Sequence, residues 1–175
     1  VIGLGLIGNS AAQYYQHLGC RVLAFDRHEL RCRAGRECGL VQPTQVSSDA
    51  DIREVVMLAS GGRGADIVVE CSGDVANIPL CFDLAKTYGH IHLQGAYLEP
   101  YPLIVQQTIF PKSLCVTSSC GATPLHREET YRWIAAGKLI VKPMFTEMLP
   151  VDKAQEGYQR AIHEPNKCLK LAFRW

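Results

Sequence analysis

Hydrophobic residues recur along this chain with two different periods. Short apolar runs rich in β-branched residues, such as residues 67–69, predict buried strands. Stretches with apolar residues three and four positions apart, such as Ile52, Val55 and Val56, predict amphipathic helices. Strands are predicted over residues 1–2, 21–25, 66–71, 90–94, 103–105 and 114–118, and helices over residues 6–18, 29–38, 50–60 and 78–88.

The alternation of strands and helices defines the expected fold class. Parallel strands joined by crossover helices form an α/β doubly wound sheet with helices on both faces. From about Gly121 onward, the sequence no longer continues this regular alternation of strands and helices. Beyond it we expect a second, α+β unit with helices over residues 124–136 and 151–162 and strands over residues 144–149 and 167–173.

The first eight residues, V-I-G-L-G-L-I-G, contain the spacing G-x-G-x-x-G directly after a strand and before a helix. In a dinucleotide site, Gly3 would permit the tight turn, Gly5 would leave room for a pyrophosphate, and Gly8 would let the helix pack closely on the sheet. The N–H groups of Leu6 and Ile7 would face the phosphates at the positive end of the helix dipole.

An acidic residue stands where such a site needs one. Asp26 ends the second predicted strand, 21 residues after Gly5, where its carboxylate can accept hydrogen bonds from the adenosine ribose. A carboxylate repels a 2′-phosphate, so the sequence favours NAD over NADP. Arg27 keeps NADP open as the second choice, because an arginine can accommodate that phosphate. The alternative is a glycine-rich turn beside a surface aspartate, with no ligand.

Composition narrows the function classes. The 175 residues are 47% hydrophobic and carry a net charge of +1, which argues against nucleic-acid and membrane-surface partners. The eight cysteines form no C-x-x-C pair, so we expect free thiols in a reducing cytoplasm and no metal site in this chain. The chain has no initiating Met and only two residues precede the glycines, so we expect a piece of a longer polypeptide.

Two longer motifs carry a family resemblance. Residues 60–73, S-G-G-R-G-A-D-I-V-V-E-C-S-G, resemble the entry to the fourth strand in medium-chain dehydrogenases, the superfamily of zinc-dependent alcohol and polyol dehydrogenases. Residues 142–154, K-P-M-F-T-E-M-L-P-V-D-K-A, resemble the segment with which that family returns to its catalytic domain. The resemblance covers essentially the whole chain, in order.

The resemblance implies a division of the chain and a reaction. Residues 1–121 would form an NAD(P)-binding Rossmann domain with strand order 3-2-1-4-5-6, and residues 122–175 would return to an N-terminal catalytic domain outside this chain. The implied reaction is hydride transfer between nicotinamide and a small alcohol, polyol, ketone or aldehyde. Any catalytic zinc would bind in that other domain, so we expect no catalytic residue here and no turnover by this chain alone.

The resemblance also implies cofactor contacts and a partner. Arg31 and Lys170 match basic residues near the adenosine and the phosphates, although both also fit surface charges. An edge strand over Pro102 to Gln106 would pair two copies into a homodimer. The remaining implied contacts lie at strand ends: Cys71, Ser72, Gln94, Gly95, Ser118 and Cys120.

Two other functions also fit the sequence. Zinc-free quinone oxidoreductases share much of this half of the family. A non-catalytic NAD-sensing domain would share the glycine loop and the strand-end aspartate, but would not be expected to carry both longer motifs.

Overall fold

A parallel sheet forms the centre of the molecule. The structure is a computed structural model that describes residues 1–164 and 166–175. Ile2 forms parallel bridges with both Phe25 and Glu70, so it joins the two parts of the sheet. The hydrogen-bonded order is β2, β1, Ile2, β3, β4, β5. The strands are β1 (Ala24–Asp26), β2 (Pro43–Gln45), β3 (Ala65–Glu70), β4 (Ala85–Leu93) and β5 (Cys115–Ser118).

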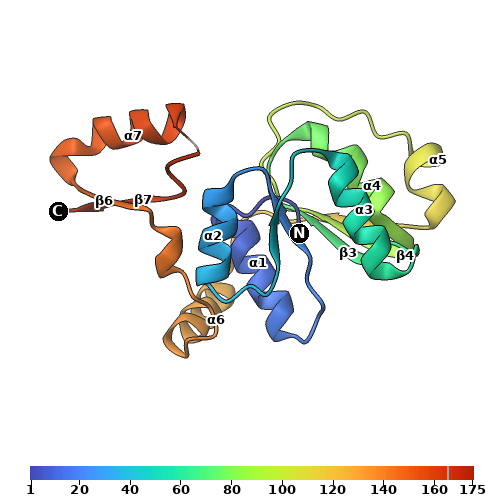
Figure 1. Cartoon of the computed structure of the whole chain (residues 1–175), viewed down its shortest axis with the longest axis horizontal. Helices are drawn as coiled ribbons and strands as arrows, with labels where there is room; N and C mark the ends of the chain where they lie inside the picture. Colours follow the sequence, from blue (N-terminus) through green and yellow to red (C-terminus); the bar gives the residue numbers. More distant parts are fainter. Residues whose placement is uncertain (165) are drawn as a thin grey trace.

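Helices cover both faces of this sheet (Figure 1), and a separate hydrophobic core lies between the helices and the sheet on each face. One core packs residues such as Leu80, Val56 and Ile91 between the sheet and two helices, α3 (Asp49–Ser60) and α4 (Ile78–Leu84). A smaller core packs residues such as Leu4 and Cys32 beneath α1 (Leu6–His17) and α2 (Glu29–Glu37). The predicted α/β class, a doubly wound Rossmann-type sheet, is confirmed.

The first three helices begin and end within one residue of their predicted bounds, because local signals fix them. Ser48 accepts a hydrogen bond from the N–H of Asp51, and the Asp51 carboxylate accepts one from the N–H of Ser48, so α3 begins in a capping box. Gly61, at a φ of 63°, ends the same helix in the left-handed conformation that favours glycine.

The predicted helix over residues 78–88 is wrong in its second half. Helix α4 ends at Leu84, and β4 begins at Ala85, which pairs with Ala65 of β3. Gly89 lies within this strand instead of ending a helix, and Tyr88 beside it has a φ of 59°. A Cβ at Gly89 would lie 2.7 Å from the Lys86 carbonyl oxygen, so the irregular turn of the chain requires glycine there.

The predicted edge strand over residues 102–106 is also wrong. Among the described residues, no strand ladder includes this segment, and α5 (Val105–Thr108) begins inside it. Leu103, Ile104 and Val105 are exposed apolar residues. A short 3-10 helix, η2 (Phe110–Lys112), then leads into β5.

The C-terminal residues form a small unit that stands beside the main sheet in Figure 1. Helix α6 (Pro124–Ala135) packs on α1, with the ring centroids of Trp133 and Tyr14 5.0 Å apart. Gln13 also donates to the Ile140 carbonyl and accepts from its N–H, at 2.9 and 2.8 Å. Two parallel strands follow, joined by a helix. The elements are α6 (Pro124–Ala135), η3 (Lys142–Met144), β6 (Glu147–Pro150), η4 (Val151–Lys153), α7 (Ala154–His163) and β7 (Leu171–Arg174).

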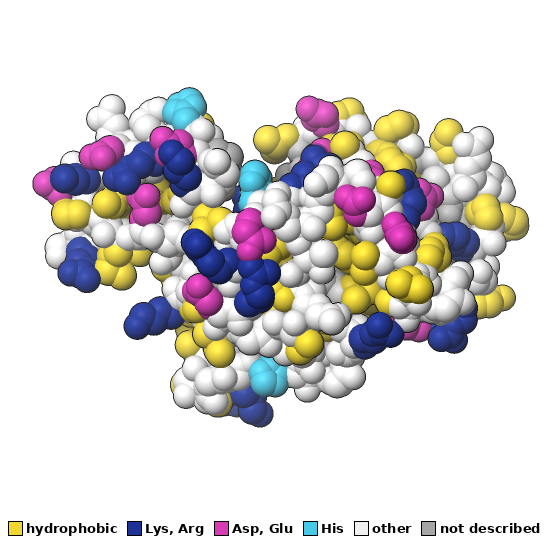
Figure 2. Space-filling view, viewed as in Figure 1, with side chains coloured by type: hydrophobic (Ala, Val, Ile, Leu, Met, Phe, Trp, Pro, Cys, Tyr) yellow, Lys and Arg dark blue, Asp and Glu magenta, His cyan; other side chains and the backbone are white. Residues whose placement is uncertain are grey.

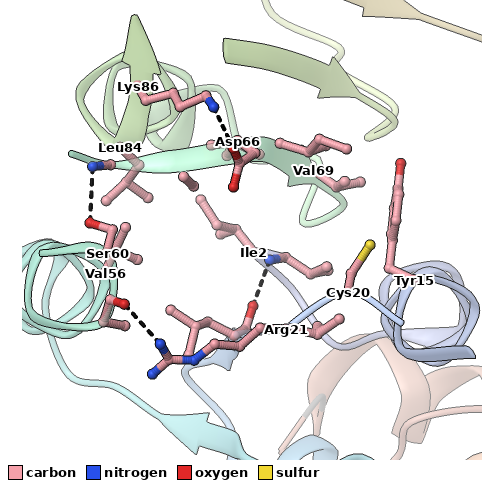
Figure 3. Close-up of a pocket in the computed structure, with 18 of the residues that line it drawn as sticks. Ile2, Tyr15, Cys20, Arg21, Val56, Ser60, Asp66, Val69, Leu84 and Lys86 are labelled. Atoms are coloured by element: carbon pink, nitrogen blue, oxygen red, sulfur yellow. Dashed lines mark hydrogen bonds and ion pairs between the residues drawn. The ribbon is translucent and has the colours of Figure 1, made fainter. Parts of the chain in front are cut away.

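A cavity of about 490 Å³ lies between β3 and the segment before β1 (Figure 3). Its lining is mostly apolar and includes Val56, Leu84 and Val69. The Val1 ammonium group borders it and donates to the Leu23 carbonyl oxygen at 2.8 Å.

Candidate functional site

The carboxyl ends of the parallel strands meet at one edge of the sheet, where a ligand of such a sheet is expected to bind. The glycine loop between Ile2 and α1 lies at this edge. The Gly3 N–H donates to the Phe25 carbonyl at 2.8 Å, and the Cys71 N–H donates to the Ile2 carbonyl at 2.8 Å. The loop is therefore held between the ends of β1 and β3.

Two of the three loop glycines are required by close packing, and the third borders open space. Gly3 has a φ of 85°, and a Cβ there would lie 2.8 Å from the Ser72 nitrogen. A Cβ at Gly8 would overlap the Gly3 carbonyl oxygen and lie 3.1 Å from the Cys71 Cβ. At Gly5, no described atom other than those of Gly5 and its two chain neighbours lies within 4 Å of the Cβ position. Open space thus remains directly above Gly5.

The N-terminus of α1 presents unpaired donors to this space. Gly5 is the N-cap, and within the described chain no side chain caps the helix and no acidic residue occupies its first turn. The backbone N–H groups of Leu6 and Ile7 stand in that first turn, where an α-helix leaves its donors without internal partners. Free donors and the positive end of the helix dipole favour an anion here.

Asp26 fixes the loop from the side of β1. Its side chain is only 3% exposed, and its Oδ2 accepts from the Leu4 N–H of the glycine loop at 2.7 Å. Oδ1 accepts from the His28 N–H at 2.8 Å, and Arg31 forms an ion pair with Oδ2 at 3.4 Å. The carboxylate therefore organises the loop in addition to any role toward a ligand. Asp26 and Arg31, which were each predicted to lie near the adenosine of a cofactor, are therefore in contact with each other.

A cavity of about 200 Å³ opens beside Asp26. Arg27 borders it with an exposed side chain, which lies 4.0 Å from the Asp49 carboxylate and donates to the side-chain Oδ1 of Asn77 at 3.5 Å. Five residues predicted to contact a cofactor line this cavity: Gly3, Asp26, Arg27, Arg31 and Ser72. The cavity therefore mixes carboxylate, guanidinium and hydroxyl groups, which suits a ribose and its substituents.

The other predicted strand-end residues lie farther along the same edge, outside this cavity. A Cβ at Gly95 would lie 2.7 Å from the Gly73 Cα, so the ends of β3 and β4 touch through glycines. Gln94 Nε2 donates to the Ser119 carbonyl at 3.3 Å, and Ser118 Oγ donates to the Leu93 carbonyl at 2.7 Å. These contacts join the ends of β4 and β5.

Three predicted residues have distinct surroundings. Burial raises the pKa of the Cys71 thiol to about 12, so Cys71 is a neutral group beneath the glycine loop. Cys120 is exposed after β5. Lys170 lies in the C-terminal unit, where its carbonyl accepts from the Thr146 N–H at 3.1 Å, and it is not among the residues that line the cavity.

Sequence reasoning missed three residues of this edge. Glu70 ends β3 fully buried, Tyr97 donates to its carboxylate, and Asn77 Nδ2 donates to Ser72 Oγ at 2.8 Å. The available signal was a charged residue closing the otherwise apolar stretch I-V-V-E. Such a residue must find hydrogen-bond donors inside the fold.

Among residues 1–164 and 166–175, no group of three or more His, Cys, Asp or Glu side chains could hold a metal ion. His90 and His92 both hydrogen-bond to Thr117 Oγ1, at 2.6 and 2.9 Å. Across the described part of the chain, no helix has the length and apolar character needed to span a membrane. Figure 2 shows acidic and basic side chains interspersed on one face.

The parallel sheet, the glycine loop at a helix N-terminus and the strand-end aspartate together define a Rossmann-type protein. The sequence profile of the zinc-binding dehydrogenase family matches residues 7–138. The chain belongs to this family.

Known relatives agree with this assignment. The L-threonine 3-dehydrogenase of Bacillus licheniformis is 27% identical, over 99% of this chain and 50% of the relative. The structure of an alcohol dehydrogenase from Thermotoga maritima superposes with a TM-score of 0.86 at 20% identity, covering 99% of this chain and 49% of that one. A second structure, an alcohol dehydrogenase of Escherichia coli CFT073 complexed with NADH, has a TM-score of 0.84 at 19% identity, over 99% and 51%. The chain spans about half the length of the curated relatives it matches.

The glycine contacts predict a contrast between two matched substitutions. Gly8→Ala places a methyl group on the Gly3 carbonyl and should lower the free energy of unfolding by about 2–3 kcal/mol. Gly5→Ala places the same methyl group in open space and should change it by less than about 1 kcal/mol. Denaturant unfolding of both variants measures the difference. Equal losses of stability would show that the loop does not pack as described.

Proposed function

We propose that this chain is the cofactor-binding portion of an NAD-dependent oxidoreductase that transfers hydride between nicotinamide and an alcohol, a polyol or the corresponding carbonyl compound. One observation carries the proposal. The uncapped N-terminus of α1 faces open space above Gly5, and the Asp26 carboxylate lies beside it. Family membership and the dehydrogenase names of the relatives support the same reaction class.

The residues present fit a dinucleotide. The N–H groups of Leu6 and Ile7 would bind the diphosphate, and no side chain at Gly5 would block it. Asp26 would accept from the adenosine ribose, with Arg27 and Arg31 at its sides. Backbone groups near Gly95 would orient the nicotinamide half. When bound, the cofactor supplies the hydride chemistry. This chain contributes binding and orientation, and we assign no catalytic residue within it.

We also propose how the chain is divided and how it fits into a longer protein. Residues 1–121 would bind the cofactor, and residues 122–175 would pack against a catalytic domain that carries the substrate pocket and any zinc. This chain alone would then turn over no substrate. Its eight free cysteines fit a reducing cytoplasm. Residues 102–106 form no strand here. Three of their apolar side chains are nevertheless exposed, so we propose that this segment contributes to a homodimer contact.

NADH titration tests cofactor binding. We expect the protein to bind NADH with a change in nicotinamide fluorescence, and Gly5→Leu to abolish binding, because the leucine side chain fills the space above the loop. The matched control is Leu58→Ala, an exposed position on α3 far along the chain from the loop. Undiminished binding by Gly5→Leu would overturn the site assignment.

The choice between the two cofactors gives a second prediction. NADH should bind at least about tenfold more tightly than NADPH, because the Asp26 carboxylate repels a 2′-phosphate and tenfold corresponds to only about 1.4 kcal/mol. Competition of NADPH with bound NADH measures the ratio. Raising the salt concentration should narrow it, and a preference for NADPH would assign Arg27 and Arg31 to the phosphate instead.

A further inference from the structure

A carboxylate outside the cavity has the densest hydrogen bonding at this edge of the sheet. Glu70 is the last residue of β3 and is fully buried, at 0% exposure. Its Oε1 accepts from the N–H and the hydroxyl of Ser72, the former at 2.9 Å. Its Oε2 accepts from the Gly73 N–H at 3.2 Å and from the Tyr97 hydroxyl. Four donors therefore converge on one side chain.

These donors come from two different loops. Ser72 and Gly73 follow β3, whereas Tyr97 follows β4. The Glu70 main chain adds to the connection, since its carbonyl accepts from the N–H groups of Gln94 and Gly95 at 2.9 and 3.1 Å. A Cβ at Gly95 would lie 2.8 Å from Glu70 Oε2. Glu70 thus fixes the spacing between the loop at residues 71–74 and the loop at residues 94–97.

The network continues toward the cavity beside Asp26. Ser72 Oγ, held by Glu70, accepts from Asn77 Nδ2, and Asn77 Oδ1 accepts from Arg27 at 3.5 Å. On the other side, the Gly3 turn packs directly on the Ser72 backbone. A shift of residues 71–74 would therefore change the gap between the glycine loop and the end of β4.

Tyr97 is suited to remain a donor in this arrangement. Burial and the hydrogen bond to the Glu70 carboxylate both raise the pKa of its phenol, so it keeps its proton at physiological pH. No Lys or Arg forms an ion pair with Glu70 among the pairs found in residues 1–164 and 166–175. Hydrogen-bond donors alone stabilise this buried carboxylate, and removing its acceptor atoms leaves those donors unsatisfied.

We infer that Glu70 is a positioning residue, which holds the loops at residues 71–74 and 94–97 at the separation that the nicotinamide half of the cofactor requires. The inference rests on the proposed function. It assigns the adenosine half to the Asp26 cavity, which Glu70 does not line. Loss of the Glu70 contacts should therefore weaken binding of the whole dinucleotide much more than binding of its AMP half, which this network reaches only indirectly, through Ser72 and Asn77.

Glu70→Gln is the first test, made in the full-length protein. Glutamine keeps the size of the side chain but replaces one acceptor oxygen with an NH₂ group, which cannot accept from Ser72 or Gly73. We expect the Kd for NADH, measured by fluorescence, to rise at least about tenfold, and the Kd for AMP, measured by calorimetry, to stay within about twofold. Asp66→Asn is the control, since it changes an exposed carboxylate at the other end of the same strand.

Tyr97→Phe covers the case in which Glu70→Gln fails to fold. It retains the aromatic ring and the carboxylate and removes one of the four donors, so a rise of about threefold to tenfold in the NADH Kd is expected, again without a change for AMP. An equal loss of NADH and AMP binding would mark a general structural role and overturn the inference. Unchanged NADH binding in both variants would overturn it as well. A wild-type protein that binds neither ligand would instead refute the proposed function.

Discussion

The structure depends most on the close contact between the glycine loop and the backbone that follows β3. Gly3 turns at a φ of 85° against the Ser72 backbone, and Gly8 seats the first turn of α1 on the Gly3 carbonyl. A single side-chain atom at either position would separate the helix from the sheet. Because this contact fixes where α1 begins, it also fixes where the free N–H groups point. The packing of α1 and the position of its free N–H groups are therefore set by the same few atoms.

Two buried carboxylates reinforce that contact from opposite sides. Asp26 accepts from the N–H of Leu4, and Glu70 accepts from the N–H groups of Ser72 and Gly73. In both cases backbone donors of the loops satisfy much of the charge, which is the compensation that a buried carboxylate needs. The loops at this edge are consequently held by charge-assisted hydrogen bonds, and the donors at the N-terminus of α1 stay available for a ligand.

The elements with local signals could be predicted from the sequence. Helix α3 has its capping box at Ser48 and its glycine at position 61, and its predicted and observed bounds differ by one residue. Residues 85–88 lacked such a signal. Their apolar spacing continues that of α4, but pairing of Ala85 with Ala65 across 20 residues of sequence draws them into the sheet. A contact between distant residues overrides local periodicity there.

In the candidate site, too, residues with local sequence signals could be predicted, and residues brought together by long-range contacts could not. Gly3, Gly5, Gly8 and Asp26 could be placed because their roles follow from short spacings within one strand–helix–strand unit. Glu70 could not be paired with Tyr97 from sequence, since 27 residues separate them and only the sheet register brings them together. The apolar run at residues 103–105 predicted a strand, yet a strand also needs a neighbour with free backbone groups, and this segment has none among the described residues.

The C-terminal unit leaves part of its apolar surface uncovered. Its strands and helix bury a small interior of their own, in which Tyr158 packs on Phe173 with ring centroids 5.6 Å apart. Met148 and Ile162 nevertheless remain 55% and 66% exposed. A two-stranded sheet with one helix has too little area to cover all of its apolar side chains. The proposed packing of residues 122–175 against a catalytic domain would cover them, so the surface chemistry of this unit and the family assignment of the chain support the same architecture.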